Sequence, residues 1–412
     1  MNMAQKIPQD YFSRNIEAIG YHNLNDKPAF KLAMQEINQR WYLYVAHLWH
    51  RGWSVLDVTD ASAPELCNFI PGPANTWTIQ IQVAEGKMIT GLERIAPGWG
   101  GVEGQSFTEG FFIFDVSEPT RPRQLGHFQT GSTGSHRNFY DGGNFVHAAA
   151  GAPGFSGKIY RIVDIADPAK PREVGRFALP EQAPGANTNS LKFSFHGPAH
   201  VEGNRAYLSY GDGGGIILDV SDFAEPKLIS QLAFRGITAT QGIHTYLPLA
   251  RRKIALINDE AIRENGDENL NLAGIVDISD EKRPRMLALF PLPEPAPESE
   301  LTNFYEKGGR FGPHNHHHPN HQPCLEDRDD VAYLTYFNAG LRVYDIRDPR
   351  QPKEIAYFVP ADPVTRIGLK PSRLVAQSED VIVDRRGCIY LSDKNHGIHI
   401  LRLKEVWPYA AV

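Results

Sequence analysis

The sequence contains few cysteines and no long apolar run. Only three of its 412 residues are cysteines, and Cys67, Cys324 and Cys388 form no Cys-x-x-Cys pair, which suits a reducing compartment. Nowhere do 18 apolar residues follow one another, and the first twelve residues lack the apolar core of a signal peptide. We therefore expect a cytoplasmic location and no association with a membrane.

The chain also lacks a strong excess of one charge and the short motifs of several enzyme classes. Its formal net charge is −6, from 42 basic and 48 acidic residues, and no basic stripe with interleaved aromatic residues indicates a nucleic-acid surface. No Gly-x-Ser-x-Gly elbow and no GxxxxGK[ST] phosphate loop occurs, so serine-nucleophile and P-loop chemistry are not indicated. Nucleic acid is therefore not expected as a partner.

One repeated pattern, by contrast, is abundant. Its clearest copy is Ile217-Leu218-Asp219-Val220-Ser221-Asp222, and five further copies carry their aspartate at Asp57, Asp115, Asp164, Asp277 and Asp345. Each copy indicates a strand followed by a tight turn, because Asp accepts hydrogen bonds from the amides beyond it and the prolines nearby end a strand ladder. We therefore assign these aspartates a structural role in turns, on the face opposite to the candidate site.

Each repeat is expected to hold four strands. In the fourth repeat two strands joined by a hairpin turn, His196 to Val201 and Arg205 to Tyr210, precede the pattern. Successive repeats lie roughly 50 to 70 residues apart, which matches a four-stranded propeller blade. A seventh copy at 397–403 lacks the aspartate and a following strand, and residues 15–21 resemble the missing strand. We therefore predict an all-β fold, a seven-bladed β-propeller in one domain over residues 1–412, whose last blade is completed by the N-terminal strand.

These repeats resemble those of the LVIVD-repeat β-propeller family, which is named for the consensus of this apolar and aspartate pattern. The resemblance covers nearly the whole chain and implies a propeller fold. It implies no particular chemistry, because propellers serve as hydrolases, oxidases, lyases and interaction platforms alike. The function must therefore come from the site residues.

Histidines recur at one position of the repeat. Counted back from the second strand of each unit, His136 and His196 align without a gap, and His244 precedes its second strand by the same interval. The first strand of every blade lines the central channel of a propeller, so these side chains are expected to meet on the axis. His314 is the equivalent in the sixth unit, but an insertion breaks the count there. The competing residues are His316, His317, His318 and His321.

Four imidazoles on one axis predict a metal centre. The arrangement is analogous in architecture to the four histidines that hold Fe(II) in carotenoid-cleavage oxygenases, although the sequences do not match. We predict one divalent metal ion, iron first and zinc, manganese or copper as alternatives, held by His136, His196, His244 and His314. The same count places Glu379 beside it as a fifth ligand, an acceptor for an imidazole N–H or a general base. The alternative is that the histidines hydrogen-bond the backbone of the neighbouring blade.

The loops between second and third strands are expected to rim the entrance to this site. They contain Glu93, the segment Asn258 to Glu260, and His396. Of these residues we assign a catalytic role to His396, together with Glu379. Aromatic residues nearby indicate a partly apolar organic substrate. The residues expected to contact that substrate are His47, His50, Trp77, Tyr140, His200 and His317.

The expected function is that of a metal-dependent enzyme. Four neutral ligands would leave the ion its full positive charge, which suits oxygen activation or polarisation of a carbonyl group. An oxygenase acting on a small, partly aromatic molecule is the first expectation, and a redox-neutral lyase, isomerase or lactonase is the alternative. A third reading is a propeller without catalysis that binds protein partners. The sequence predicts neither the substrate nor the oligomeric state.

Overall fold

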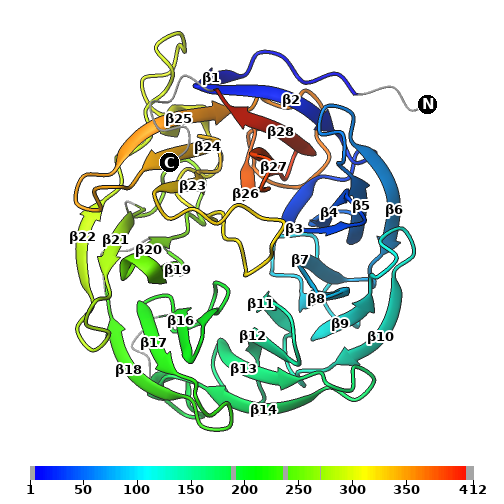
Figure 1. The fold of residues 1–412 in the computed structure, drawn as a ribbon, viewed down its shortest axis with the longest axis vertical. Coiled ribbons are helices and arrows are strands. Elements are labelled where there is room, and N and C mark those ends of the chain that lie inside the picture. The colour runs from blue at the N-terminus through cyan, green and yellow to red at the C-terminus, as the bar shows by residue number, and fades with distance from the viewer. Residues whose placement is uncertain (1–4, 187–191, 235–239, 270, 405–412) are drawn as a thin grey trace.

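The computed structural model describes residues 5–186, 192–234, 240–269 and 271–404, which fold almost entirely into antiparallel β-sheets. The sheets stand around a central axis like the blades of a propeller (Figure 1). Five of them have four strands, and a larger one joins two four-stranded sets through the pairing of His47 with Thr78. The expected all-β class and propeller-like arrangement are therefore confirmed.

Within each set the strands follow one another outward from the axis, each paired with the next (Figure 1). The larger sheet contains β3 (Ala29–Ile37), β4 (Arg40–His47), β5 (Gly52–Asp57), β6 (Glu65–Pro71), β7 (Thr76–Ala84), β8 (Lys87–Arg94), β9 (Phe111–Asp115) and β10 (Arg123–Phe128). The next three contain β11 (Ser135–Phe139), β12 (Phe145–Gly151), β13 (Lys158–Asp164) and β14 (Arg172–Phe177); β15 (His200–Glu202), β16 (Arg205–Ser209), β17 (Gly215–Asp219) and β18 (Lys227–Leu232); and β19 (Ile243–Leu249), β20 (Ile254–Asp259), β21 (Ala273–Asp277) and β22 (Arg285–Leu289).

The last two sheets each include a strand from the N-terminal region. One contains β23 (Val331–Thr335), β24 (Leu341–Asp345), β25 (Lys353–Val359) and β1 (Phe12–Arg14), and the other contains β26 (Ser378–Val383), β27 (Cys388–Asp393), β28 (Ile398–Leu403) and β2 (Ile16–His22). β2 pairs antiparallel with β28, with Ile16 opposite Leu403. This is the pairing expected for residues 15–21, and it joins the two ends of the described chain into one sheet.

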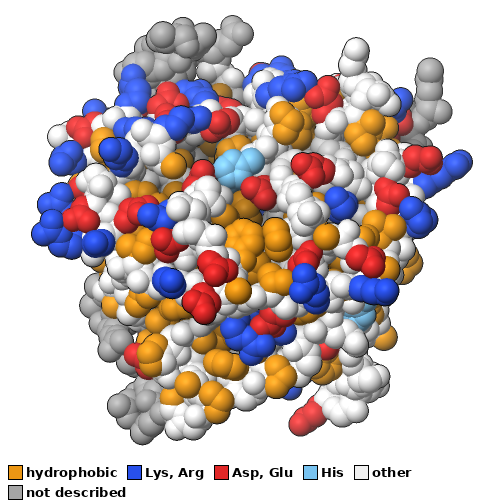
Figure 2. All heavy atoms as spheres, turned by 60° about the horizontal axis from the view of Figure 1, so that its bottom comes forward, with side chains coloured by type: hydrophobic (Ala, Val, Ile, Leu, Met, Phe, Trp, Pro, Cys, Tyr) orange, Lys and Arg blue, Asp and Glu red, His pale blue; other side chains and the backbone are white. Residues whose placement is uncertain are grey.

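Helical structure is scarce. The described residues contain two 3-10 turns, Pro180–Gln182 and Ala250–Arg252, and one short helix, α1 (Phe304–Lys307). No helix in the part of the chain that the structure describes is long and apolar enough to cross a membrane. On the face drawn in Figure 2, acidic and basic side chains lie interspersed, in line with the mixed charges of the sequence.

The six repeated aspartates form turns of the same kind. In every copy one carboxylate oxygen accepts a hydrogen bond of 2.9 to 3.0 Å from the backbone N–H two residues later. In the fourth repeat Asp219 pairs with Arg205, which lies beside the hairpin at Glu202 and so at the end of the sheet away from His196. The structural role assigned to these aspartates is confirmed.

Neighbouring sheets pack closely where these turns meet the outermost strands. A Cβ atom added to Gly175 on β14 would lie 1.7 Å from the carbonyl oxygen of Phe223 in the next turn, and one added to Gly126 on β10 would lie 1.6 Å from that of Pro168. Apolar clusters fill the space between sheets. One of them combines Tyr207 of β16 with Ile257 of β20. The core is therefore divided into layers between successive sheets, which leaves the axis free for polar residues.

The insertion in the sixth repeat crosses the axis. The segment 312–325 runs over the middle of the ring in Figure 1, and only one bridge, His316 to Leu334, pairs it with β23. It contacts both halves of the eight-stranded sheet, where Asn320 bonds Gln82 and Cys324 bonds the carbonyl of Met34, and two further sheets, where Gln322 bonds the carbonyl of Asp141 and His321 that of Val201. The insertion that obscured the alignment of His314 therefore fills one end of the channel.

Candidate metal centre

The four aligned histidines meet on the axis. His136 lies on β11, His196 precedes β15, His244 lies on β19 and His314 lies in the segment before β23. The ring centroids of consecutive members are 4.2, 5.3 and 4.8 Å apart, and the Nε2 atoms of His136 and His196 are separated by 3.1 Å. All four side chains are buried. The structure thus brings together His314, and not its competitors, with the other three.

Hydrogen bonds fix the orientation of these rings. Nδ1 of His136 contacts a carboxylate oxygen of Glu93 at 2.5 Å, and Nδ1 of His314 donates to the backbone carbonyl of Glu379 at 2.7 Å. Since both acceptors lack a proton to give, the ring proton sits on Nδ1 and the lone pair on Nε2, which faces the axis. Metal-binding histidines are held in the same way, by an acceptor on the ring nitrogen that does not bind the ion.

Glu260 is a candidate ligand that sequence reasoning placed only on the rim. Its Oε2 atom lies 3.0 Å from Nε2 of His196 and 3.7 Å from Nε2 of His244. Among the described residues, these three side chains are the group whose ligand atoms all lie within 4.8 Å of one another. Ligand atoms about 2.0 to 2.2 Å from one metal ion lie about 3 to 3.5 Å apart. The separation between Glu260 and His196 falls in this range, and the wider separation from His244 requires that ring to move inward, so the group is a candidate ligand set with one carboxylate in place of an all-histidine set.

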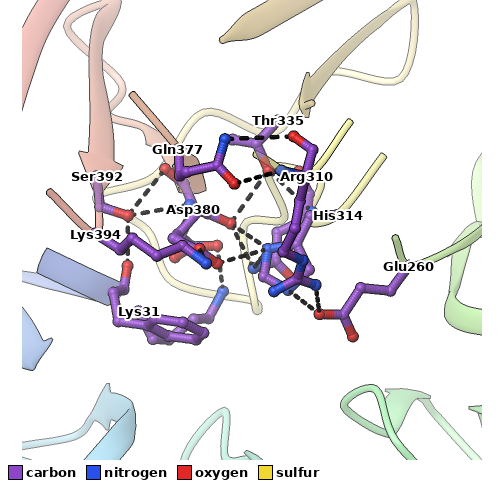
Figure 3. Close-up of polar contacts among 12 residues, drawn as sticks. Lys31, Glu260, Arg310, His314, Thr335, Gln377, Asp380, Ser392 and Lys394 are labelled. Atoms are coloured by element: carbon purple, nitrogen blue, oxygen red, sulfur yellow. Dashed lines mark hydrogen bonds and ion pairs between the residues drawn. The ribbon is translucent and has the colours of Figure 1, made fainter. Parts of the chain in front are cut away.

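Two carboxylates beside the histidines, those of Glu260 and Glu93, are held ionised by neighbouring cations. Burial alone would raise the pKa of Glu260, but Arg310, which makes an ion pair with it, and the adjacent histidines lower it well below its usual range. Figure 3 shows Arg310 reaching Glu260 beside His314. The pKa of Glu93 is lowered in the same way by His136 and by Lys158, whose Nζ atom lies 3.0 Å from a carboxylate oxygen of Glu93. Both groups can thus face a cation as full negative charges.

Glu379 supports His314 rather than facing the other histidines. One of its carboxylate oxygens lies 3.3 Å from Nδ1 of His314, and the other lies 2.5 Å from the ammonium group of the buried Lys394. Its neighbour Asp380 makes a similar pair of 2.8 Å with Lys31, and Figure 3 shows Asp380 and Lys31 near Lys394. Of the three roles considered for Glu379, that of an acceptor behind an imidazole ring is taken by its backbone carbonyl, and its carboxylate lies beside the same ring.

Arg137 was not anticipated from the sequence. It follows His136 on β11, is 1% exposed, and donates from Nη2 to the Nε2 atoms of His244 and His314 at 3.1 Å each. A lone pair of His244 that accepts from Arg137 cannot bind a metal at the same time. Occupation of the full ligand group therefore requires this hydrogen bond to be released.

A pocket of about 660 Å³ opens beside the histidines, within the usual size of small-molecule sites. His136, His196 and Glu260 line its inner end. One wall is apolar, from the cluster of Phe30, Leu48, Trp77 and Ile79 with Trp99 packed against it. The opposite wall is polar and includes Ser132, Thr133, Ser156, Lys158 and Ser194. Of the residues expected to contact substrate, Trp77 lies here.

Three other expected site residues are held by structural contacts away from this pocket. His47 is fully buried between the carbonyl of Pro28, 3.1 Å away, and the hydroxyl of Ser54, 2.7 Å away. The hydroxyl of Tyr140 donates to the carbonyl of Gly143. His396 donates from Nε2 to the carbonyl of Ala361 at 2.7 Å. The geometry gives none of these three a place beside the metal ligands, because their polar atoms already have partners elsewhere in the sheets.

The remaining three expected residues also lie outside the pocket. His50 is exposed on the loop after β4, and His317 bonds the carbonyl of Glu326 and the backbone N–H of Val383. His200 lines a separate small cavity on the axis with His316 and His318. These histidines lie near the axis or near the loops in sequence, but their side chains point into other surroundings.

Comparison with known proteins agrees with the fold. The family model described as LVIVD repeat matches residues 154–178 and 199–233, and no curated protein matches the chain in sequence. The periplasmic gluconolactonase PpgL of Pseudomonas aeruginosa is similar in structure, with a TM-score of 0.56 and 10% identity over 87% of this chain and 94% of that one. The computationally designed protein Ika8 gives a TM-score of 0.48 at 10% identity, over 93% and 98% of the two chains. The chain therefore contains segments that match the LVIVD repeat, at residues 154–178 and 199–233, and it has a β-propeller-like fold.

Proposed function

We propose that this protein is a seven-bladed β-propeller enzyme that holds one divalent metal ion on its axis and opens a lactone or related ester of a small organic molecule. The blade number counts the eight-stranded sheet as two blades, since a single residue pair joins its two halves. The observation that carries the proposal is the group of His196, His244 and Glu260, whose ligand atoms converge next to the pocket that His196 and Glu260 line.

The ligand set supports a redox-neutral reaction. Two imidazoles and one carboxylate form the zinc site of several hydrolases, and they leave room for water and substrate on the ion. Such an ion polarises a carbonyl oxygen and makes water a better nucleophile. Because Glu260 contributes a negative charge, the site differs from the all-histidine set expected from the sequence. That difference removes the reason for placing oxygen activation first.

The pocket walls can hold a substrate in one orientation. The apolar side, with Trp77 and Trp99, fits a hydrocarbon or aromatic portion, and the buried indole N–H of Trp77 has no hydrogen-bond partner among the described residues. The ion pair of Lys158 with Glu93 lies at the polar side, next to His136. These groups place the polar end of a substrate next to the metal ligands. Lactones are the first compounds to test, since the similar fold of PpgL belongs to a gluconolactonase.

An oxygenase is the second candidate, for a specific reason. Two histidines and one carboxylate are also the ligands of non-haem Fe(II) oxygenases. Iron in the purified protein, and oxygen consumption that depends on an organic substrate, would favour this candidate. Zinc or manganese with turnover under argon would favour the lactonase.

Metal analysis of protein purified without a metal-affinity column tests the centre itself. We expect near-stoichiometric metal in the wild type and a loss of at least tenfold in both His196→Ala and Glu260→Gln. His396→Asn is the matched control, because His396 lies outside the ligand group, and it should keep its metal. A wild-type protein that stays free of metal after anaerobic purification with iron and zinc supplied would overturn the proposal and favour a propeller that binds protein partners.

The proposal includes a cytoplasmic location and a small-molecule substrate. The three cysteines are free thiols, with Cys324 and Cys388 buried, which suits a reducing compartment. Neither nucleic acid nor a membrane is part of the proposal.

A further inference from the structure

Five buried or nearly buried cations surround the axis, and four of them have a carboxylate partner. The pairs are Lys158 with Glu93, Arg310 with Glu260, Lys394 with Glu379, and Lys31 with Asp380. Each pair is neutral overall. The fifth cation, Arg137, therefore decides the net charge of the protein groups at the axis.

Arg137 has no carboxylate within ion-pair distance among the described residues. Its two hydrogen-bond acceptors are the Nε2 atoms of His244 and His314, and because a ring nitrogen that accepts from a guanidinium carries no proton, both rings are neutral. Its Nε and Nη1 atoms are buried without a partner among the described residues. A guanidinium group stays protonated in proteins, and a buried charge without compensation is strongly unfavourable. The axis thus carries one positive charge that the protein does not neutralise.

A small cavity of about 20 Å³ lies against Arg137, on the side of the crossing segment. Several of its lining groups lack a partner among the described residues, namely both ring nitrogens of His200 and of His316 and the side-chain amide nitrogen of Gln80. All three side chains are more than nine-tenths buried. A neutral imidazole always carries one N–H. The cavity is therefore surrounded by unused donors next to an uncompensated cation.

The size of the cavity limits what it can hold. About 10 to 15 Å³ accommodates one water molecule, so 20 Å³ holds a single small particle and excludes sulfate, phosphate or an organic acid. A water molecule would satisfy some donors but would not compensate the charge of Arg137. A monoatomic anion does both.

We propose that this cavity binds one halide ion, chloride in the cell, which serves as the counter-ion of Arg137 and accepts hydrogen bonds from His200, His316 and Gln80. Arg137 lines both this cavity and the substrate pocket, whereas His200, His316 and Gln80 line only the cavity, so the anion sits on the side of Arg137 away from that pocket. A metal ion on the axis would add positive charge and strengthen binding. The ion stabilises the point where the crossing segment meets β7, β11 and β15.

Crystals of the full chain grown in sodium bromide test the proposal directly. We expect an anomalous bromine peak within about 3.5 Å of Arg137 and in contact with His200. A peak of ordinary solvent density without anomalous signal at bromide concentrations up to 0.5 M would identify a water molecule and overturn the proposal. Diffraction from metal-free protein separates this result from the fate of the metal centre.

Thermal unfolding in solution provides a second test. Raising bromide or chloride from its dissociation constant to 100 times that concentration should raise Tm by about 3 °C. Sodium methanesulfonate at the same ionic strength should not, because methanesulfonate is too large for the cavity. Equal effects of the two salts would contradict a specific site.

Two arginine variants show whether Arg137 is responsible. Arg137→Gln should lose the halide-dependent rise in Tm and the bromine peak. Arg342→Gln is the matched control, since Arg342 is also fully buried but lies 3.3 Å from its partner Glu354. This control is expected to be less stable and yet to keep the halide effect. Retention of the effect in Arg137→Gln would overturn the proposal even if the variant folds poorly, because the salt response is compared within each protein.

Discussion

Glu93 illustrates how a single side chain prepares the centre. It accepts from Nδ1 of His136 while Lys158 holds its other oxygen. The contact fixes the ring so that Nε2 faces His196. Orientation of this kind typically contributes 10- to 100-fold to metal affinity, so the contribution of Glu93 can be measured apart from any catalytic activity.

We predict that Glu93→Gln weakens metal binding by about 10- to 100-fold while leaving the fold intact. An amide can still accept from His136 but brings no charge and can equally turn its NH₂ group toward the ring. Competition with a chromogenic chelator measures the affinity. Glu173→Gln is the control, because Glu173 also pairs with arginines but on the outer part of a different sheet. An affinity for Glu93→Gln equal to that of the control would show that the contact between Glu93 and His136 does not support metal binding.

At the scale of the element, the outermost strands limit how closely the sheets can approach. The glycines at positions 126 and 175 lie where the bulged outer strand meets the turn of the next repeat. In the following sheets the same register position lies opposite the isoleucine or valine two residues before the repeated aspartate. It is occupied by Ser230, Ala288 and Ala356. Small residues there let each aspartate turn settle against its neighbour.

We predict that Gly175→Leu destabilises the protein by about 1 to 3 kcal/mol or more, because the new side chain would overlap the carbonyl of Phe223 and push two sheets apart. Urea unfolding followed by tryptophan fluorescence measures the change. Leu228→Val, on the equivalent strand β18 at a half-exposed position, should shift the free energy of unfolding by less than about 0.5 kcal/mol. Comparable stability of the two variants would mean that the packing of Gly175 against the turn at Phe223 contributes little to stability.

The sequence predicted what repeats within an element and missed what depends on side-chain direction. The aspartate turns and the alignment of His136, His196 and His244 follow from fixed spacing along adjoining strands. Glu260 and Arg137 gave no repeated signal. Glu260 directly follows β20, and Arg137 is the residue after the aligned His136.

The errors among the expected catalytic and substrate-binding residues have the same origin. His47 and His396 lie near loops that reach the correct end of the sheets, but successive residues of a strand or turn face different sides. A backbone carbonyl in a neighbouring segment, at Pro28 or Ala361, accepts from each ring. Such contacts between distant segments cannot be inferred from spacing within one repeat.

At the scale of the whole molecule, closure of the ring depends on the pairing of β2 with β28. Without β2, the backbone groups of β28 would form an open sheet edge. The apolar residues that pack against Ile16 of β2, such as Val343 and Leu401, would also lose this contact. Open edges promote association between chains. Glu379 lies on β26 of the same sheet, and Lys394 directly follows β27. We therefore expect β2 to help hold these two residues in position, although β2 is the outermost strand.

We predict that a chain starting at Asn23 loses both cooperative unfolding and most of its metal, whereas a chain starting at Tyr11 keeps both. The longer deletion removes β1 and β2, so the last sheet is left with three strands and a free edge. The shorter deletion leaves both strands in place. Calorimetry and metal analysis measure the two properties, and size-exclusion chromatography shows whether the exposed edge causes aggregation. If the chain starting at Asn23 remained monomeric with wild-type Tm and metal content, the axis would be held by the other sheets alone and closure would have no bearing on the site.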